Sequence, residues 1–305
     1  MTLQRGTDST IAIETPRPDP KMIAVAETTT QFMPIPEKVY AVLRNDDRFL
    51  VSYPRSGSRW MRIIIADLMH CREGIDSSVV YEQQLEIEME ASICPSPNMG
   101  TRGVVPCVYE DYAPTADLSH AGGQPIWRSH NLSQIITRSK TRIVYLFRSP
   151  IFALVSYYYY LQRAKHEAVR DVDINEFCTN RAGDWARQVT DATDFCRAAP
   201  DRILLVQYRG DAVFDRQQVR AMLSFLSVDC QWRMIDDAIG RFHTFLQRLN
   251  SAGAFACRRG IDEDPPRHIT RRAAKQIMRY TQTIFDQAVQ IGNAQLRERR
   301  AESHG

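Results

Sequence analysis

The segment 51–60, VSYPRSGSRW, contains the residue types of an anion-binding loop. It follows a short apolar run and precedes a stretch in which apolar residues recur at helical spacing. Gly57 allows the backbone to approach a ligand closely, and backbone N–H groups at the start of a helix point toward one place where an anion can sit. Charge and hydroxyl donors come from four neighbouring side chains: Arg55, Ser56, Ser58 and Arg59. The loop predicts a phosphate or sulfate site, although an ordinary strand–turn–helix connection with solvated arginines fits the same residues.

This loop differs from the usual phosphate loop of nucleotide triphosphatases. That pattern, G-x-x-x-x-G-K-[ST], requires an earlier Gly and a final Lys next to Ser or Thr. YPRSGSRW has neither, and no carboxylate suited to magnesium follows a predicted strand. A P-loop kinase acting on a small molecule is therefore an alternative without its usual residues.

The elements that must position this loop are short buried strands alternating with helices. Apolar runs predict strands near 48–53, 125–129, 142–147 and 202–208. Such alternation is typical of a parallel sheet covered on both faces, and ligands of these folds bind at the carboxyl ends of the strands. We therefore predict a single α/β domain over residues 40–295, with a central parallel β-sheet flanked by helices. Residues 1–35, rich in Thr, Pro and charge, are expected to form a flexible N-terminal leader.

Composition excludes several classes of protein. A net charge of +3 over 305 residues is too small to indicate a nucleic-acid partner. The seven Cys are scattered without a C-x-x-C pair, which favours reduced thiols in the cytoplasm over disulfides or a metal site. The longest apolar run, IFALVSYYYYL, is too short to span a bilayer, and the N-terminus lacks the pattern of a signal peptide. We expect a soluble cytoplasmic protein that has no metal.

Five segments, taken in order, resemble the motifs of a known enzyme family. YPRSGSRW resembles the 5′-phosphosulfate loop, usually Y-P-K-S-G-T-T-W, of sulfotransferases that use PAPS (3′-phosphoadenosine 5′-phosphosulfate). IWRSHNL corresponds to that family's K-T-H or K-S-H strand end, and LFRSPIFALVSYYYY to its R-N-P-x-D-x-x-x-S-Y-Y motif. LLVQYRGD and RRGIDEDP correspond to a strand ending in Y-E-D and to R-K-G-x-x-G-D-W. A shorter similarity links GDWARQV to the G-S-W-x-x-H-V segment of many bacterial members. The resemblance covers roughly residues 45 to 290 and implies a P-loop-NTPase-like fold with a phosphosulfate-binding loop.

The resemblance also implies a reaction and a set of roles. The sulfuryl group of PAPS would pass by in-line displacement to a hydroxyl of an acceptor, whether a small molecule, a glycan or a lipid, without a metal. Arg55 would stabilise the leaving oxygen and His130 would be the general base, since an unperturbed imidazole titrates near pH ~6.5. Arg128 joins them, because residues two apart in a strand share a face. The residues expected to bind PAPS are Arg55, Ser56, Gly57, Ser58, Arg59, Trp60, Arg148, Ser156, Tyr208, Arg258, Arg259 and Gly260.

Several alternatives stay open at this stage. Trp60 and Tyr208, expected to flank the adenine, also fit simple core packing, and Arg258 and Arg259 also fit a solvated pair. Most of the four tyrosines 157–160 are expected to pack, because consecutive residues on a helix point in all directions. The acceptor is expected to bind against segments 71–125 and 163–185.

The chain departs from the family's usual residues at several positions: Arg55 for Lys, Arg59 for Thr, Ile151 and Phe152 for a polar pair, Glu263 for Gly and Pro265 for Trp. A non-catalytic or weakly active relative that binds PAP, the product nucleotide, is therefore a second hypothesis. The sequence does not indicate the oligomeric state.

Overall fold

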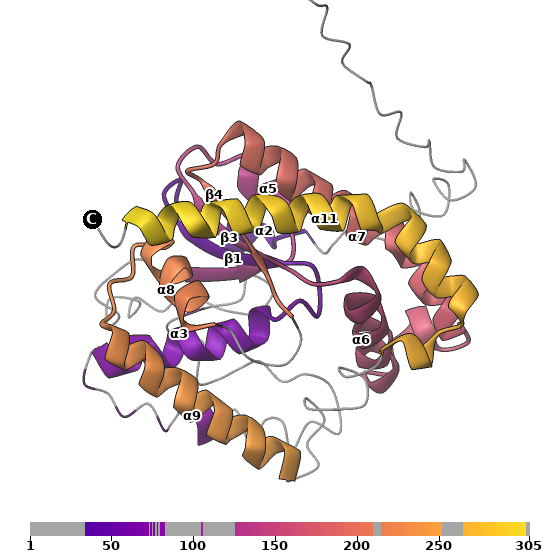
Figure 1. Cartoon of the computed structure of the whole chain (residues 1–305), viewed down its shortest axis with the longest axis horizontal. Coiled ribbons are helices and arrows are strands. Elements are labelled where there is room, and N and C mark those ends of the chain that lie inside the picture. The colour runs from indigo at the N-terminus through magenta and orange to yellow at the C-terminus, as the bar shows by residue number, and fades with distance from the viewer. Residues whose placement is uncertain are drawn as a thin grey trace, which may run out of the picture.

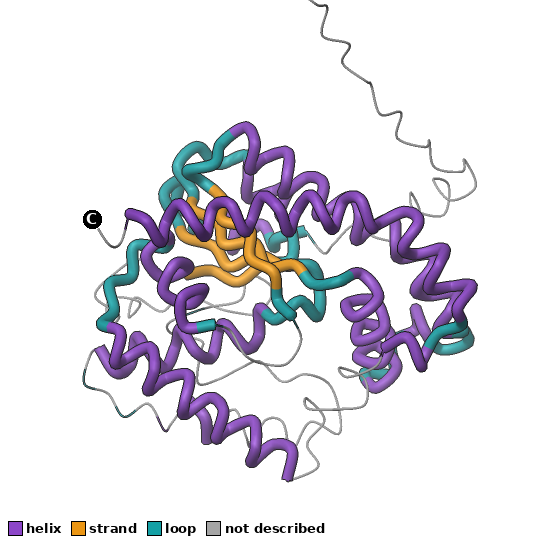
Figure 2. The backbone as a smooth tube through the Cα atoms, in the orientation of Figure 1, coloured by secondary structure: helices purple, strands orange, loops and turns teal. Residues whose placement is uncertain are grey.

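The computed structural model describes residues 34–72, 74, 76, 78, 80–82, 105, 126–209, 215–251 and 265–302. A parallel four-stranded sheet forms its centre (Figure 2), in the order β2-β1-β3-β4. Its strands are β1 (Arg48–Ser52), β2 (Ile126–Ser129), β3 (Arg142–Phe147) and β4 (Ile203–Gln207). All four predicted strands are confirmed to within one residue at either end, and so is the α/β fold class.

These segments form strands because they are short apolar runs that are buried on both faces. Successive side chains of a strand point to opposite faces, so each strand supplies two cores. Phe49 and Val51 of β1 pack on one side of the sheet, and Leu50 packs on the other. In register, Leu50 lies beside Arg128 of β2 and Val144 of β3.

Helices cover both faces of the sheet (Figure 1). On the side of Leu50, the core is completed by α3 (Ser58–Arg72), α8 (Arg216–Phe225) and α9 (Trp232–Ser251). On the side of Phe49, it is completed by α2 (Glu37–Tyr40), α5 (Leu132–Ile136), α6 (Pro150–Arg163), α7 (Ile174–Ala198) and α11 (Arg271–Glu302). Two short 3-10 turns, η3 (Glu167–Val169) and η5 (Pro265–His268), precede α7 and α11.

Helix α11 lies directly against β4. A Cβ atom on Gly292 would lie 2.6 Å from the carbonyl oxygen of Leu205, so only glycine allows this approach. The Gln295 side chain accepts a hydrogen bond from Leu205 N at 3.0 Å and donates one to Ile203 O at 2.7 Å. These bonds satisfy backbone groups of β4, which forms one edge of the described sheet.

The predicted leader, 1–35, lies outside the described residues except for Pro34 and Ile35. Ile35 is buried in the core, and its backbone N–H donates a hydrogen bond of 2.7 Å to Gln134 Oε1. Among the described helices, none is long and apolar enough to cross a membrane.

Candidate functional site

The candidate site lies at the carboxyl ends of the four strands. Strand β1 lies between β2 and β3, so the connection from β1 to β2 and the connection from β2 to β3 run in opposite directions along the sheet, an arrangement that opens a crevice at the strand ends. The residues that follow the strands are the loop after Ser52, His130 after β2, Arg148 after β3 and Tyr208 after β4. The prediction that Arg55, His130 and Arg148 share one edge of the sheet is confirmed by this parallel arrangement.

The loop between β1 and α3 has the backbone shape of an anion cradle. Arg55 and Gly57 both have positive φ angles, of 67° and 91°, and Ser56 N donates to Tyr53 O at 3.2 Å to close the turn. The Ser56 side chain is fully buried, and its Oγ has no hydrogen-bond partner within the part of the chain that the structure describes. A buried hydroxyl at the start of a helix favours a ligand that accepts its hydrogen bond.

Glycine is required at position 57 for a second reason. A Cβ atom there would lie 2.6 Å from Tyr208 Cγ, so the tyrosine ring covers the loop directly. Tyr208 is only 4% exposed, and its backbone N–H donates to Phe147 O at 2.7 Å. The packing role of Tyr208 is therefore observed, and adenine stacking stays a prediction.

Arg55 connects this loop to helix α6. Its Nε donates a hydrogen bond of 3.1 Å to Ser156 Oγ, and its guanidinium lies 5.3 Å from the ring centroid of Tyr160. The structure thus brings together two residues that were both predicted to bind PAPS. The positive φ angle of Arg55 costs a non-glycine residue roughly 1–3 kcal/mol. The contacts with Ser156 and Tyr160 help hold Arg55 in this backbone conformation.

Arg148 is buried between two aromatic rings. Its guanidinium carbon lies 5.3 Å from the ring centroids of both Phe152 and Tyr208. The aromatic rings favour the cation and orient it at the end of β3. Phe152, which replaces a polar residue of the family motif, therefore contacts Arg148, one of the residues predicted to bind PAPS.

Trp60 packs against helix α9. Its ring meets Phe242 and Phe245 edge-on, with centroids 5.7 and 6.5 Å apart. The packing interpretation of Trp60 is observed, and its contact with adenine stays a prediction. Of the remaining predicted nucleotide ligands, Arg59 lies in the first turn of α3, next to the loop. Arg258, Arg259 and Gly260 lie outside the described residues, as does Glu263.

His130 stands at the centre of a hydrogen-bond network. Its Nδ1 lies 2.7 Å from Ser52 O and 3.3 Å from Ser52 Oγ. A carbonyl oxygen only accepts, so Nδ1 carries the proton and Nε2 carries the lone pair. That lone pair accepts a hydrogen bond from Arg128 Nη2 at 2.8 Å. The structure therefore pairs Arg128 and His130, as their shared strand face predicted.

The network continues into the anion loop and helix α7. Arg128 Nε donates to Ser58 Oγ at 3.2 Å, and Ser52 Oγ donates to the same atom at 2.9 Å. On the other side, Gln188 Nε2 donates to the backbone carbonyl of His130. Gln188 was not predicted, and its only sequence signal was the segment GDWARQV, in which it replaces the family's His.

The surroundings keep His130 neutral. Burial, followed by the nearby Arg128 cation, lowers the pKa of His130 to about 3, against a smaller opposing effect of its bond to Ser52. The expected titration near pH 6.5 is therefore wrong for this structure, because that value belongs to a solvated imidazole far from a cation. At neutral pH the ring is a free base but a weak one.

The four tyrosines mostly pack, as predicted. Tyr157 meets Tyr53 edge-on with centroids 6.2 Å apart, and Tyr158 donates to Val172 O at 3.0 Å. Tyr159 Oη lies 3.0 Å from His268 Nδ1. Tyr160 differs in that it touches a predicted catalytic residue, Arg55.

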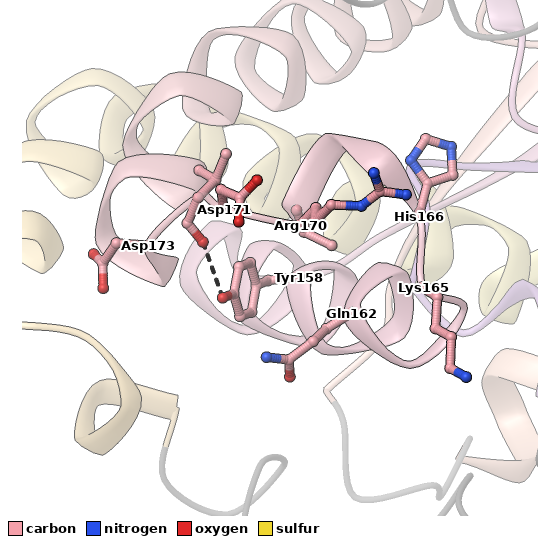
Figure 3. Close-up of a pocket in the computed structure, with 9 residues that line it drawn as sticks. Tyr158, Gln162, Lys165, His166, Arg170, Asp171 and Asp173 are labelled. Atoms are coloured by element: carbon pink, nitrogen blue, oxygen red, sulfur yellow. Dashed lines mark hydrogen bonds between the residues drawn. The ribbon is translucent and has the colours of Figure 1, made fainter.

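A surface pocket of about 600 Å³ lies at the end of α6 (Figure 3). Its lining comes from α6, η3 and the start of α7: Tyr158, Gln162, Lys165, His166, Val169, Arg170, Asp171, Val172 and Asp173. Most of these residues fall within 163–185, one of the segments expected to bind the acceptor. Tyr158 and Gln162 lie on a different side of α6 from Ser156 and Tyr160, so this pocket does not face Arg55. The other expected segment, 71–125, lies mostly outside the described residues.

Comparison with known proteins agrees with this geometry. The chain matches the family model of the sulfotransferase domain over residues 45–245, more than half of its length. Its fold is similar to that of the mouse sulfotransferase SULT7A1, whose crystal structure contains PAP, with a TM-score of 0.50 and 15% sequence identity. That similarity covers 88% of this chain and 94% of the mouse chain, and at this identity it is evidence for the fold alone. No curated protein sequence matches the chain.

Proposed function

Because the chain belongs to the sulfotransferase family, we propose that it transfers a sulfuryl group from PAPS to a hydroxyl group of an acceptor. The observation that carries the proposal is the position of His130, a neutral imidazole linked through Arg128 to the anion loop. Sulfuryl transfer requires an anion site next to a proton acceptor, and these residues supply both.

The described residues fit the phosphosulfate end of the donor. The loop offers the buried Ser56 hydroxyl and backbone N–H groups around Gly57, and Arg55 stands beside it. Arg148 would bind the 3′-phosphate, with Ser156 bridging toward Arg55. These two sets of donors, joined by the bond from Arg55 to Ser156, would match a nucleotide that carries two anionic groups. The mouse protein of similar fold was crystallised with PAP, the product of such a reaction.

The proposed chemistry is an in-line displacement at sulfur. The acceptor oxygen forms a bond to sulfur while the bond from sulfur to the bridging oxygen of the 5′-phosphate breaks, and that oxygen keeps the electron pair. Arg55 stabilises the new negative charge as a hydrogen-bond donor, since a guanidinium does not give up its proton at neutral pH. His130 Nε2 takes the proton of the acceptor hydroxyl and later releases it to solvent.

A second candidate is a non-catalytic protein that binds PAP. The observation in its favour is that Arg128 occupies the His130 lone pair in the structure. Thermal denaturation with PAP, compared with ATP and magnesium, tests which nucleotide binds. Stabilisation by PAP alone supports the family's nucleotide, and stabilisation by ATP and magnesium alone favours a kinase. PAP binding without any turnover in a transfer assay favours the second candidate.

The decisive experiment is single-turnover transfer of labelled sulfuryl from PAPS. The acceptor is first identified from a panel of phenols, sugars and lipid alcohols. We expect His130→Asn to fold, to bind PAP like the parent and to transfer ~10²–10⁴ times more slowly, the usual contribution of a positioned base. His70→Asn is the matched control, because His70 lies in the last turn of α3, far from the strand ends. If His130→Asn keeps more than about a third of the parent rate, His130 is not the base.

We also propose a cytoplasmic location. Cys178 and Cys196 are buried free thiols, and burial raises their pKa values to about 12 and about 11. Thiols kept protonated and reduced suit a reducing compartment. Recovery of the native protein in a secreted or periplasmic fraction would contradict this.

A further inference from the structure

The hydrogen bond between Arg128 and His130 has a consequence for when the base can act. Nδ1 of His130 donates to Ser52 O at 2.7 Å, so Nε2 is the atom left to accept a proton. In the structure Nε2 already accepts a hydrogen bond from Arg128 Nη2 at 2.8 Å. A guanidinium stays protonated at any physiological pH, so Arg128 cannot relay a proton and instead covers the lone pair.

His130 is held in place at its ring and at its backbone. Its Nδ1 is bound to the end of β1, and its backbone carbonyl accepts a hydrogen bond from Gln188 of α7. Gln188 is buried, and its Oε1 accepts from the Tyr145 hydroxyl at 3.1 Å. Uncovering Nε2 by rotation of the ring would break the hydrogen bond from Nδ1 to Ser52 O, so the partner more easily moved is the half-buried Arg128 side chain.

Arg128 also reaches the anion loop. Its Nε donates to the hydroxyl of Ser58, the first residue of α3, at 3.2 Å. The guanidinium therefore lies between the base and the place proposed for the sulfuryl group. A hydrogen bond between a guanidinium and an anion is stronger than one between a guanidinium and a neutral imidazole. An anion in the loop would compete with Nε2 for the same N–H groups.

We infer that Arg128 acts as a latch on the general base, covering His130 Nε2 until the sulfuryl group of bound donor draws the guanidinium to itself. This inference rests on the proposed function. It makes the base available only after the donor is in place, so an acceptor that arrives first meets a blocked imidazole. The two donors of Arg128 fit this role, because Nε contacts the loop while Nη2 contacts the base.

The charges around His130 support this order of events. The cations that face it are Arg128 from β2 and Arg55 from the loop, and both oppose its protonation. Ser52 and Gln188, which also contact His130, are uncharged. Pairing Arg128 with a donor anion would weaken the main electrostatic effect that opposes protonation, so donor binding should strengthen the base.

The test is nitrogen NMR of the full-length chain labelled in its histidines, titrated with pH in three states: ligand-free, with PAP and with PAPS in the absence of acceptor. His130→Asn assigns the resonance. We expect ligand-free His130 to remain neutral between about pH 5 and 8, and PAPS to shift the Nε2 resonance. PAPS should also raise the pKa by about one unit or more, a tenfold gain in proton affinity. PAP, which lacks the sulfuryl group, should cause a smaller rise.

Variants separate the latch from the proposed function. Arg128→Met should raise the pKa of His130 in the ligand-free protein and remove the additional rise caused by PAPS. Arg142→Met is the matched control, because Arg142 begins β3 at the opposite end of the sheet, and it should leave the titration unchanged.

Two results would overturn the latch while leaving the proposed function intact. One is PAPS binding, measured by calorimetry, that leaves the His130 resonance and pKa unchanged. The other is a ligand-free Arg128→Met protein whose His130 titrates like the parent. Failure of both PAP and PAPS to bind would instead overturn the proposed function, and with it the inference that bound donor draws Arg128 away from His130. The ligand-free comparison would then still decide whether Arg128 covers Nε2. If Arg128→Met does not fold, the PAPS titration of the parent decides the question.

Discussion

Replacing Gly57 with alanine should damage the anion loop more than its single added methyl suggests. The new Cβ would lie 2.6, 2.8 and 2.9 Å from three ring atoms of Tyr208, and that ring is buried under Arg148 with little room to move. Relieving such an overlap costs about 1–3 kcal/mol. The φ angle of 91° adds a left-handed backbone penalty of roughly 1–2 kcal/mol for an L-residue. We therefore expect Gly57→Ala to lower the free energy of unfolding by about 2–5 kcal/mol.

Urea denaturation measures this loss, and two further variants divide it. Gly240→Ala is the matched control, because Gly240 is exposed on the outer side of helix α9 and its added Cβ meets nothing within 4 Å. It should stabilise the protein by roughly 0.5–1 kcal/mol through helix propensity. In a Tyr208→Ala background the overlap disappears, so Gly57→Ala should then cost only the backbone penalty of about 1–2 kcal/mol.

The same variant tests whether the loop binds nucleotide. Gly57→Ala should lose most of the thermal stabilisation by PAP, because the backbone N–H groups can no longer keep their arrangement. A Gly57→Ala protein that unfolds within about 0.5 kcal/mol of the parent and still binds PAP normally would refute this reasoning, since surface changes without structural effect stay in that range.

Three further predictions follow from other parts of the fold. Arg148→Ala should weaken PAP binding by ~1.5–3 kcal/mol in calorimetry, and Ser156→Ala should weaken it less, because a bond to a charged donor is worth more than one to a neutral hydroxyl; unchanged affinity would mean that the segment LFRSPIFALVSYYYY is only a structural turn. His130 titrates near ~6.5 when unfolded and at about 3 when folded. Stability due to its neutral form is therefore fully present above pH ~6.5 and lost as the pH falls toward 3, and urea titrations should show the parent losing about 2 kcal/mol more than His130→Gln between pH 7.5 and 5. An equal loss in both proteins would show that the ring is not held neutral. Gly292→Ala should destabilise the fold by about 1–3 kcal/mol, because its Cβ would lie 2.6 Å from Leu205 O on an adjacent strand, and parent-like stability would mean that α11 can shift from β4.

The sheet was predictable because its signal is local. Strands β1 and β3 are short runs of large apolar residues, and such runs are buried on both faces only in a covered parallel sheet. Once the strands were parallel, their carboxyl ends had to meet at one edge. The gathering of Arg55, His130 and Arg148 there followed from topology, before any side-chain contact was known.

Contacts that depend on how the helices dock were not predictable. Gln188 reaches the carbonyl of His130 across 58 residues of chain, and Arg55 reaches Ser156 across 101. No periodic pattern in the sequence predicts either contact, because each contact depends on where a whole helix packs against the sheet. The close approach of the Tyr208 ring to Gly57 is a contact of the same kind, since β4 follows the loop by about 150 residues in the chain.

The sequence did place Arg128 and His130 on one strand face, but it did not indicate how they would affect each other. Two side chains on the same face can assist one reaction or oppose each other. Which of the two occurs depends on which of their atoms are in contact. Here a guanidinium N–H meets the one imidazole nitrogen that lacks a proton, at 2.8 Å. A cation in that position disfavours a second positive charge, so the pair alone makes a poor base. An anion that pairs with Arg128 would reverse the effect, and the anion loop lies one hydrogen bond away through Ser58. In the proposed function, Arg128 and His130 can therefore act in catalysis only together with the loop and the anion that the loop is proposed to bind.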